Sequence, residues 1–264
     1  MKYDTLKIER RKSVVRVNLH RPEARNAMNR QMVCDLLDYF TAIGNDRSIR
    51  VVVLGGDGPV FCAGGDIKEM QSAATGKRKT RLRPFSEFDA MLAAVNRAPQ
   101  VVIARIHSAA MGGGLGLVCV ADMAVAAHEA ILAFPEVRLG LVPAVIAPYV
   151  VARIGLTQAR RLMLTGAHLD GKQAAEVGLV TLACPINEIN SSVNELVNAV
   201  LQAPSAALAA CKKLLLEVSS KPSEETAAYR ADLLRELQSG EAGQEGMRAF
   251  LEKRPPKWLE KVEE

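Results

Sequence analysis

The amino-acid sequence lacks any apolar run long enough to cross a membrane. Its longest apolar stretches are interrupted by Asp122, Glu129 or Glu136, and the opening residues, MKYDTLKIERR, contain no apolar signal core. We therefore expect a cytoplasmic protein that does not insert into a membrane.

Cysteine and histidine are too scattered to form a covalent or metal-bound framework. The five cysteines are widely spaced, mostly within apolar runs, and form no C-x-x-C pair. The four histidines are isolated and lack the spacing of metal ligands. These absences predict reduced core cysteines and no metal.

Two common motifs of catalysis and cofactor binding are missing as well. No G-x-S-x-G nucleophile elbow occurs. Gly112 and Gly114 begin a G-x-G-x-x-G pattern, but Leu117 stands where the last glycine is needed. A nicotinamide cofactor is therefore not expected.

Charge is not concentrated strongly in one sign. The net charge is +5, with 24% charged and 49% hydrophobic residues among 264, which is typical of an ordinary globular domain, alone or with a small appendage. The mild positive charge favours an anionic, phosphate-bearing ligand but falls short of the basic face of a nucleic-acid-binding protein. Residues 72–83 are polar and basic, and we interpret them as a solvated loop in preference to a phosphate-binding patch.

The most informative stretch is IHSAAMGGGLGLVCVAD, residues 106–122. An apolar, β-branched strand is predicted at Val101–Ile106 and a buried helix at 115–120, with three glycines between them. Glycines at a strand-to-helix junction let the backbone approach a ligand and leave the first helical N–H groups unpaired. Such donors suit an oxygen that develops negative charge. The alternative interpretation is a tight turn that lets helix and strand pack closely.

The same arrangement occurs earlier in the chain. A buried strand predicted at 51–54 leads into GGDGPVFCAGGDIKEM, where Gly64 and Gly65 precede Asp66, a candidate cap for a helix that begins at Ile67. Two converging N–H donors are the minimum for an oxyanion hole. Two unrelated loops are the alternative.

Outside these two loops, the sequence predicts both strands and helices in the first part of the chain and helices alone in the last part. Strands are predicted at 6–9, 14–19, 123–127, 131–134 and 180–184, and helices at 30–44, 84–97, 157–165 and 170–177, with caps at Asn29 and Asp170. Four helices follow, at 188–202, 205–218, 223–237 and 241–252. The change near residue 186 predicts a core of residues 1–186 and a helical region of residues 187–264.

Glu136 allows two local interpretations. Pro135 favours an extended conformation for Phe134 and puts Glu136 at the end of a predicted strand. The carboxylate is then either a partly buried base with a raised pKa or an acid at a helix start. The local sequence alone favours the second.

Taken together, the motifs resemble the crotonase (enoyl-CoA hydratase/isomerase) superfamily over nearly the full chain. The matching segments are RPEARNAMN at 21–29, FCAGGDIKEM at 61–70, GGGLGL followed by AD at 112–122, FPEVRLGLVP at 134–143 and EGMRAFLEKRPP at 245–256. This resemblance implies an α/β fold: a right-handed spiral of ββα units followed by a helical trimerisation region. It also implies a homotrimer or a dimer of trimers.

The resemblance further implies an acyl-CoA thioester as substrate, with coenzyme A entering as part of it and no separate cofactor. The N–H groups of Gly65 and Gly113 would hold the thioester oxygen. The residues that would bind coenzyme A are Ala24, Arg25, Gly65, Asp66, Ile67 and Lys68, with Phe250 and Lys253 often supplied by a neighbouring subunit.

Hydratases of the family use two glutamates, and here only the second is present. It matches Glu136, which reverses the local preference above, whereas the first falls on Gly116. The segments GGG-x-GL, LGLVPAVIAPYVV and RIGLTQARRL look most like methylglutaconyl- or isohexenylglutaconyl-CoA hydratases. The chain is thus expected to be a hydro-lyase for a branched 2-enoyl-CoA that carries a second carboxylate, which a cation from residues 77–83 would meet.

Two alternatives stay open at this point. Glu136 alone could move a proton between carbons 2 and 4 of the acyl chain, as in Δ3,Δ2-enoyl-CoA isomerases. A non-catalytic homologue that binds a CoA thioester or RNA is the other alternative. The retained Glu136 and the two glycine loops favour an enzyme.

Overall fold

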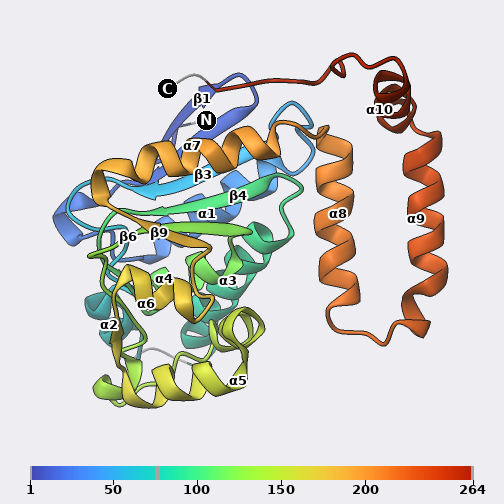
Figure 1. Ribbon diagram of the computed structural model, residues 1–264. Coiled ribbons are helices and arrows are strands. Elements are labelled where there is room, and N and C mark those ends of the chain that lie inside the picture. Colours follow the sequence, from blue (N-terminus) through green and yellow to red (C-terminus); the bar gives the residue numbers. More distant parts are fainter. Residues whose placement is uncertain (1, 75–77, 263–264) are drawn as a thin grey trace.

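The computed structural model describes residues 2–74 and 78–262, without the side chains of residues 73–84. A six-stranded sheet forms its centre (Figure 1). The strand order is β1 (Leu6–Arg11), β2 (Val14–Leu19), β3 (Val51–Gly56), β4 (Val101–Ile106), β6 (Met123–Ala127) and β9 (Leu182–Cys184). β1 and β2 pair antiparallel, and the later pairs are parallel. A smaller sheet contains β5 (Ala110–Met111), β7 (Leu132–Ala133) and β8 (His168–Leu169).

Helices cover both faces of the large sheet. α7 (Ile189–Val200) lies along one face, and α1 (Arg30–Ile43) and α3 (Arg78–Arg97) pack against each other behind the other (Figure 1). At one end of the sheet lie α2 (Ile67–Ala74), α4 (Gly113–Val120), α5 (Ala147–Thr165) and α6 (Gly171–Glu176). Short 3-10 helices occur at Pro22–Ala24 (η1), Glu136–Leu139 (η2), Ile186–Glu188 (η3) and Glu224–Thr226 (η4).

Most of the predicted elements are confirmed, and their ends follow from local chemistry. The side chain of Asn29 accepts a hydrogen bond from Met32 N at 3.0 Å and so caps α1. Asp170 and Gln173 form a reciprocal capping box at the start of α6. The valine-rich strands β2, β3 and β4 supply much of the buried core, as their β-branched composition predicts.

Two local predictions are wrong. Residues 72–83 are not one solvated loop, because α2 extends to Ala74 and α3 begins at Arg78; residues 75–77 lie outside the described part. The helix predicted from residue 157 begins ten residues earlier, at Ala147. Pro148 is compatible with this start because the first helical turn needs no N–H from it. α5 is interrupted at Gly155, which has φ 71° and ψ 163°.

The C-terminal helices divide into two groups. α7 belongs to the core, where Ile189, Val193 and Val197 are buried. α8 (Ser205–Val218), α9 (Ala227–Ser239) and α10 (Glu241–Leu251) form an arm beside the core (Figure 1). Lys212 joins the arm to the core through Asp122, at 2.7 Å. The division into domains at residue 186 stays a prediction, but the arm itself begins only with α8.

Within the part of the chain that the structure describes, no single helix has the length and apolarity needed to cross a membrane. One bent pair, Ile186–Val200 with Ser205–Val218, meets those two criteria together across a 99° bend.

Candidate active site

The two glycine loops identified in the sequence lie against each other. They follow β3 and β4, which are neighbours in the parallel sheet, so both loops leave the same edge. Cys62 N donates to Ala109 O at 3.1 Å, and Met111 N donates to Cys62 O at 3.0 Å. A methyl group added at Gly64 would lie 3.8 Å from the amide nitrogen of Gly113. The two loops therefore form one site.

Each loop contributes an unpaired backbone donor. Gly113 is the first residue of α4, so its N–H has no acceptor within the helix. On either side of Gly65, Met28 binds the chain through Gly64 O at 2.7 Å and Asp66 N at 3.0 Å. Neither Gly65 N nor Gly113 N donates a hydrogen bond to any residue that the structure describes.

The glycines in these loops are required by conformation and by space. Gly64 and Gly112 have φ of 97° and 47°, in the left-handed region that L side chains rarely adopt. A methyl group added at Gly113 would lie 2.8 Å from Met28 Cε and 3.1 Å from Phe88 Cζ. A side chain at Gly113 would therefore push the ends of the Met28 and Phe88 side chains aside, whereas one at Gly64 would meet the backbone oxygen of Met111 at 3.0 Å.

The carboxylate of Glu136 lies at the start of α4. A methyl group added at Gly112 would lie 2.7 Å from Glu136 Oε1, and Oε2 is buried without a hydrogen-bond partner among the described residues. Burial raises the pKa of this carboxyl, and its own backbone N–H opposes the rise. Glu136 is also the first residue of η2. Both local interpretations therefore hold: the residue starts a helix and is a half-buried acid.

One turn later on the same helix, Gly116 faces apolar side chains. A methyl group added there would overlap Ile146 Cγ2 and lie 3.7 Å from Leu92 Cδ1. Ile146 is 2% exposed and immediately precedes α5. Gly116 N donates to Gly112 O at 3.2 Å, so the position beside Ile146 and the position beside the Glu136 carboxylate are joined at the start of α4.

Sequence reasoning did not identify Ile146. The only signal was the apolar stretch around Pro143 and Pro148, and a contact between residues 116 and 146 cannot be read from the order of residues. Cys62 is a free, buried cysteine, as the sequence predicted, but its hydrogen bonds to the first glycine loop were not foreseen. Its buried Sγ lies 3.1 Å from Asn26 O and accepts from Gly64 N at 3.4 Å, which fixes the first glycine loop.

The residues expected to bind coenzyme A fall into two groups. Ala24 ends η1 and Arg25 follows it, and Arg25 O accepts from Ala63 N at 3.0 Å, so this loop lies on the first glycine loop. Asp66 is paired with Arg21 at 3.2 Å, and Ile67 and Lys68 begin α2 with exposed side chains. The structure thus brings together one group: Ala24, Arg25, Gly65, Asp66, Ile67 and Lys68.

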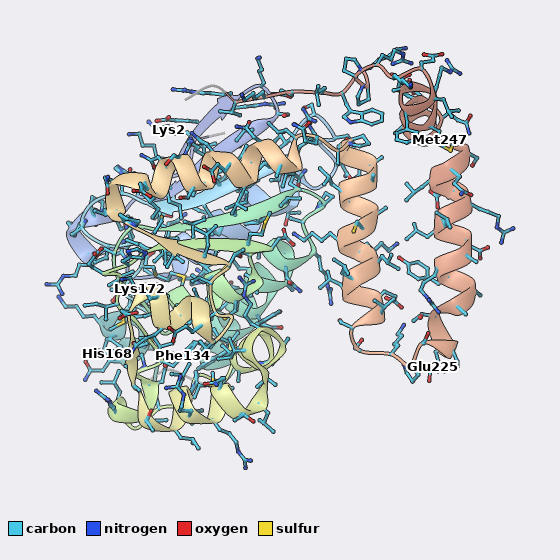
Figure 2. The ribbon with its side chains drawn as sticks, in the orientation of Figure 1. Lys2, Phe134, His168, Lys172, Glu225 and Met247 are labelled. Carbon is cyan, nitrogen blue, oxygen red and sulfur yellow. The ribbon has the colours of Figure 1, made fainter. Side chains whose placement is uncertain are left out.

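Phe250 and Lys253 are not part of this group within one chain. Both lie at the end of α10, where Phe250 is 83% exposed. Figure 2 shows Met247 of the same helix at the outer end of the arm, across the molecule from Phe134, which precedes Glu136 by two residues. Their predicted contact with coenzyme A would therefore need a second copy of the chain.

Comparisons with known proteins agree with this geometry. The family model for enoyl-CoA hydratase/isomerase matches residues 9–261. A probable enoyl-CoA hydratase, echA8, from Mycobacterium tuberculosis is 31% identical over 98% of this chain and 99% of its own. The 2,3-dehydroadipyl-CoA hydratase of Escherichia coli is 30% identical, covering 94% and 96%.

Solved structures give the same result for the fold. Pseudomonas aeruginosa AtuE superposes with a TM-score of 0.95 at 40% identity, covering 97% of this chain and 100% of that one. An enoyl-CoA hydratase/isomerase from Marinobacter aquaeolei has a TM-score of 0.93 at 41% identity, with the same coverage. The predicted crotonase-type fold is thereby confirmed. The chain belongs to the enoyl-CoA hydratase/isomerase family of the crotonase superfamily.

Proposed function

We propose that this protein adds water to a branched, glutaconyl-type 2-enoyl-CoA thioester, with Glu136 as its single acid–base residue. The observation that carries the proposal is the position of the Glu136 carboxylate. It lies against Gly112, next to the unpaired N–H of Gly113 and the loop that holds Gly65. An acid–base group and an oxyanion hole are the two parts that hydration of a conjugated thioester requires.

The backbone donors would stabilise the charge that forms during the reaction. When oxygen from water bonds to carbon 3, the electron pair of the double bond moves toward the thioester oxygen. Gly65 N–H and Gly113 N–H would hold that oxygen as the enolate forms. One such donor is typically worth about 2.7–4 kcal/mol in the transition state.

Glu136 would move one proton of the added water in two steps. As carboxylate it takes one proton from water while the oxygen attacks carbon 3, and it then returns that proton to carbon 2 of the enolate. The other proton stays on the new hydroxyl group, so the addition is balanced and redox-neutral. A raised pKa suits this double role, because the group must accept and release a proton near the working pH.

The apolar surface beside Glu136 supports a branched substrate. Ile146 and Leu92 occupy the space that a side chain at position 116 would need. Both side chains are buried, so the wall of the site behind Gly116 is apolar and suits an alkyl branch at carbon 3 better than a charged group. A second carboxylate, by contrast, would find no polar partner there.

A substrate carboxylate would need a cation at the far end of the acyl group. The sequence suggested residues 77–83 for this purpose, but Lys77 and the side chains of that segment lie outside the described residues. The relative from Escherichia coli is named for a dehydroadipyl thioester, whose acyl group comes from a dicarboxylic acid. This name supports a carboxylated substrate within the family.

Assembly would complete the site. Phe250 and Lys253 would reach coenzyme A from a neighbouring subunit of a homotrimer or a dimer of trimers. The arm carries exposed apolar side chains, including Leu215, Leu234 and Leu251, that such an assembly would cover.

The second candidate is Δ3,Δ2-enoyl-CoA isomerisation, which the presence of one carboxylate favours. The same Glu136 would remove a proton from carbon 2 and return it to carbon 4. A non-catalytic thioester- or RNA-binding role has less support, because it gives no use to a buried carboxylate beside two unpaired N–H groups.

The test follows the absorbance of the conjugated enoyl thioester with purified protein. Crotonyl-CoA, 3-methylglutaconyl-CoA and a 3-enoyl-CoA are compared, with Glu136→Gln as the inactive control and Glu129→Gln as a surface control. Loss of absorbance with the glutaconyl substrate, abolished only in Glu136→Gln, is the expected result. An increase with the 3-enoyl substrate and no hydration would identify an isomerase, and no turnover of any thioester would contradict both proposals.

A further inference from the structure

A pocket of about 470 Å³, separate from the candidate active site, lies on the α7 face of the sheet. It opens at the carboxyl ends of β2, β3 and β4, which is where ligands commonly bind to parallel sheets. Arg16 from β2, Arg105 from β4 and Asn190 from α7 line it, together with His107 from the loop after β4. None of the candidate active-site residues lines this pocket.

The two arginines are held by amides and not by carboxylates. Arg16 Nη2 donates to Asn194 Oδ1 at 3.0 Å, and Arg105 Nε donates to Asn190 Oδ1 at 2.8 Å. No carboxylate in the described part of the chain lies within 4.0 Å of either guanidinium. Each guanidinium therefore keeps N–H donors that protein groups do not use.

The electrostatics show that the two charges affect each other. Burial lowers the pKa of Arg105, and the charge of Arg16 lowers it further. Burial also lowers the pKa of Arg16; Arg11 adds to this effect and Glu9 opposes it. Like charges that are half-buried and unpaired carry a free-energy cost, which a bound anion would remove.

The acid at the rim of the pocket is already engaged. Asp57 lines the pocket, but Oδ2 pairs with His20 Nδ1 and Oδ1 accepts from Asn18 Nδ2, each at 2.8 Å. These bonds hold the carboxylate at the rim, where it pairs with neither arginine, and its one negative charge is outweighed by the two guanidinium charges.

His107 adds an unused nitrogen. Its Nε2 lies 3.0 Å from Gly58 O and must carry the proton there, because a carbonyl oxygen only accepts. Burial lowers the pKa of the ring, with Arg105 also acting against its charge. Nδ1 is then a bare acceptor, and it is buried without a hydrogen-bond partner among the described residues.

We propose that this pocket binds a phosphate group, with Arg16 and Arg105 as its hydrogen-bond donors. The guanidinium fork matches phosphate oxygens in geometry and charge. The pocket is larger than inorganic phosphate alone, so a phosphate monoester also fits by volume. This proposal does not depend on the reaction at Glu136.

The experiment measures phosphate binding by the full-length protein calorimetrically, in phosphate-free buffer with ionic strength held by chloride. Inorganic phosphate and adenosine 5′-monophosphate are titrated into wild type, Arg105→Gln and the matched surface control Arg47→Gln. We expect saturable binding that weakens by roughly tenfold or more in Arg105→Gln and not in Arg47→Gln. Tighter binding of the nucleotide would identify a monoester as the ligand, and equal binding would identify phosphate alone.

A second variant keeps the test decisive if Arg105→Gln does not fold. Asn190→Asp places a carboxylate beside Arg105 without removing the arginine, so it should stabilise the fold and weaken phosphate binding. A change in the His107 Nδ1 resonance on adding phosphate, measured by ¹⁵N NMR, locates the ligand. Absence of saturable binding, or binding unchanged in both variants, would overturn the proposal.

Discussion

Gly112, the N-cap of α4, and Gly116, whose N–H donates to Gly112 O at 3.2 Å, lie close together at the start of the helix, yet they admit different neighbours. At Gly112 the missing side chain makes room for the carboxylate of Glu136, and at Gly116 it makes room for Ile146. The position of the absent first glutamate is therefore filled by an apolar side chain. The site therefore has two halves. The polar half is the Glu136 carboxylate beside Gly112, and the apolar half is Ile146 and Leu92 beside Gly116.

The two halves also explain why a second carboxylate would not simply fit. A glutamate at position 116 would collide with Ile146, which is buried. Its charge would lie near that of Glu136 without a cation, and both the burial and the like charge disfavour the ionised form. Conversion to a two-carboxylate site therefore requires at least two substitutions.

Removing the polar half should have the largest effect. Glu136→Gln keeps the shape of the side chain but cannot take a proton from water, so we expect kcat to fall by about 10²- to 10⁴-fold. Binding of the thioester should persist, because Gly65 and Gly113 still donate. Hydration rates and product-CoA affinity measure the two effects. A fall of less than tenfold would show that another group acts as the base.

Adding a carboxylate to the apolar half is the next test. Gly116→Glu should lower the free energy of unfolding by about 1–3 kcal/mol from overpacking alone. Adding Ile146→Ala should recover part of that loss, because it removes the side chain that collides. Urea unfolding of both single variants and the double variant gives the coupling energy. Strict additivity would mean that residues 116 and 146 are not in contact.

Much of the fold and part of the site could be predicted from local sequence, but the contact between residues 116 and 146 could not. The glycine runs, the Asn29 and Asp170 caps and the strands depend on residues close together in the chain, and the structure confirms them. The contact of Gly116 with Ile146 depends instead on how the segment after η2 returns to α4. Local composition carries no information on that path.

The start of α3 and the place of Phe250 and Lys253 also could not be derived from local sequence alone. The first turns of α3 are rich in charged residues, and a basic composition alone did not distinguish a helix from a loop. Phe250 and Lys253 were assigned to the site through the family resemblance, as residues often supplied by a neighbouring subunit; their place near the end of the arm is compatible with that assignment, which stays a prediction. A site shared between chains leaves no signature in the pattern of one chain.

A smaller change would test how closely the apolar half is shaped. Ile146→Val removes one methyl group but keeps the Cγ2 that faces Gly116. We expect a loss of about 0.5–1.5 kcal/mol in the free energy of unfolding. The ratio of kcat/KM for a longer alkyl branch over a methyl branch should also rise. Ile154→Val, within α5, is the matched control and should leave that ratio unchanged.

The smallest expected effect is a dependence of stability on pH that comes from the polar half. Burial raises the pKa of Glu136 above its unfolded value, so the native state holds this proton more tightly. Stability should therefore fall as pH rises from the unfolded pKa through the folded pKa, and level off above it. In Glu136→Gln this part of the pH dependence should vanish, leaving the variant slightly more stable than wild type near neutral pH.

The same titration should act on activity in the opposite direction. Hydration needs the carboxylate form to take a proton from water, so kcat/KM should rise across the pH range in which stability falls. Urea unfolding and initial rates, measured on the same samples from pH 4.5 to 8, give both curves. An activity midpoint at the pH where stability levels off would show that one buried carboxyl causes both effects, because both features mark the folded pKa. If stability in Glu136→Gln followed the wild-type curve, the burial of Glu136 would carry no free-energy cost, and the polar half would be solvated and not strained.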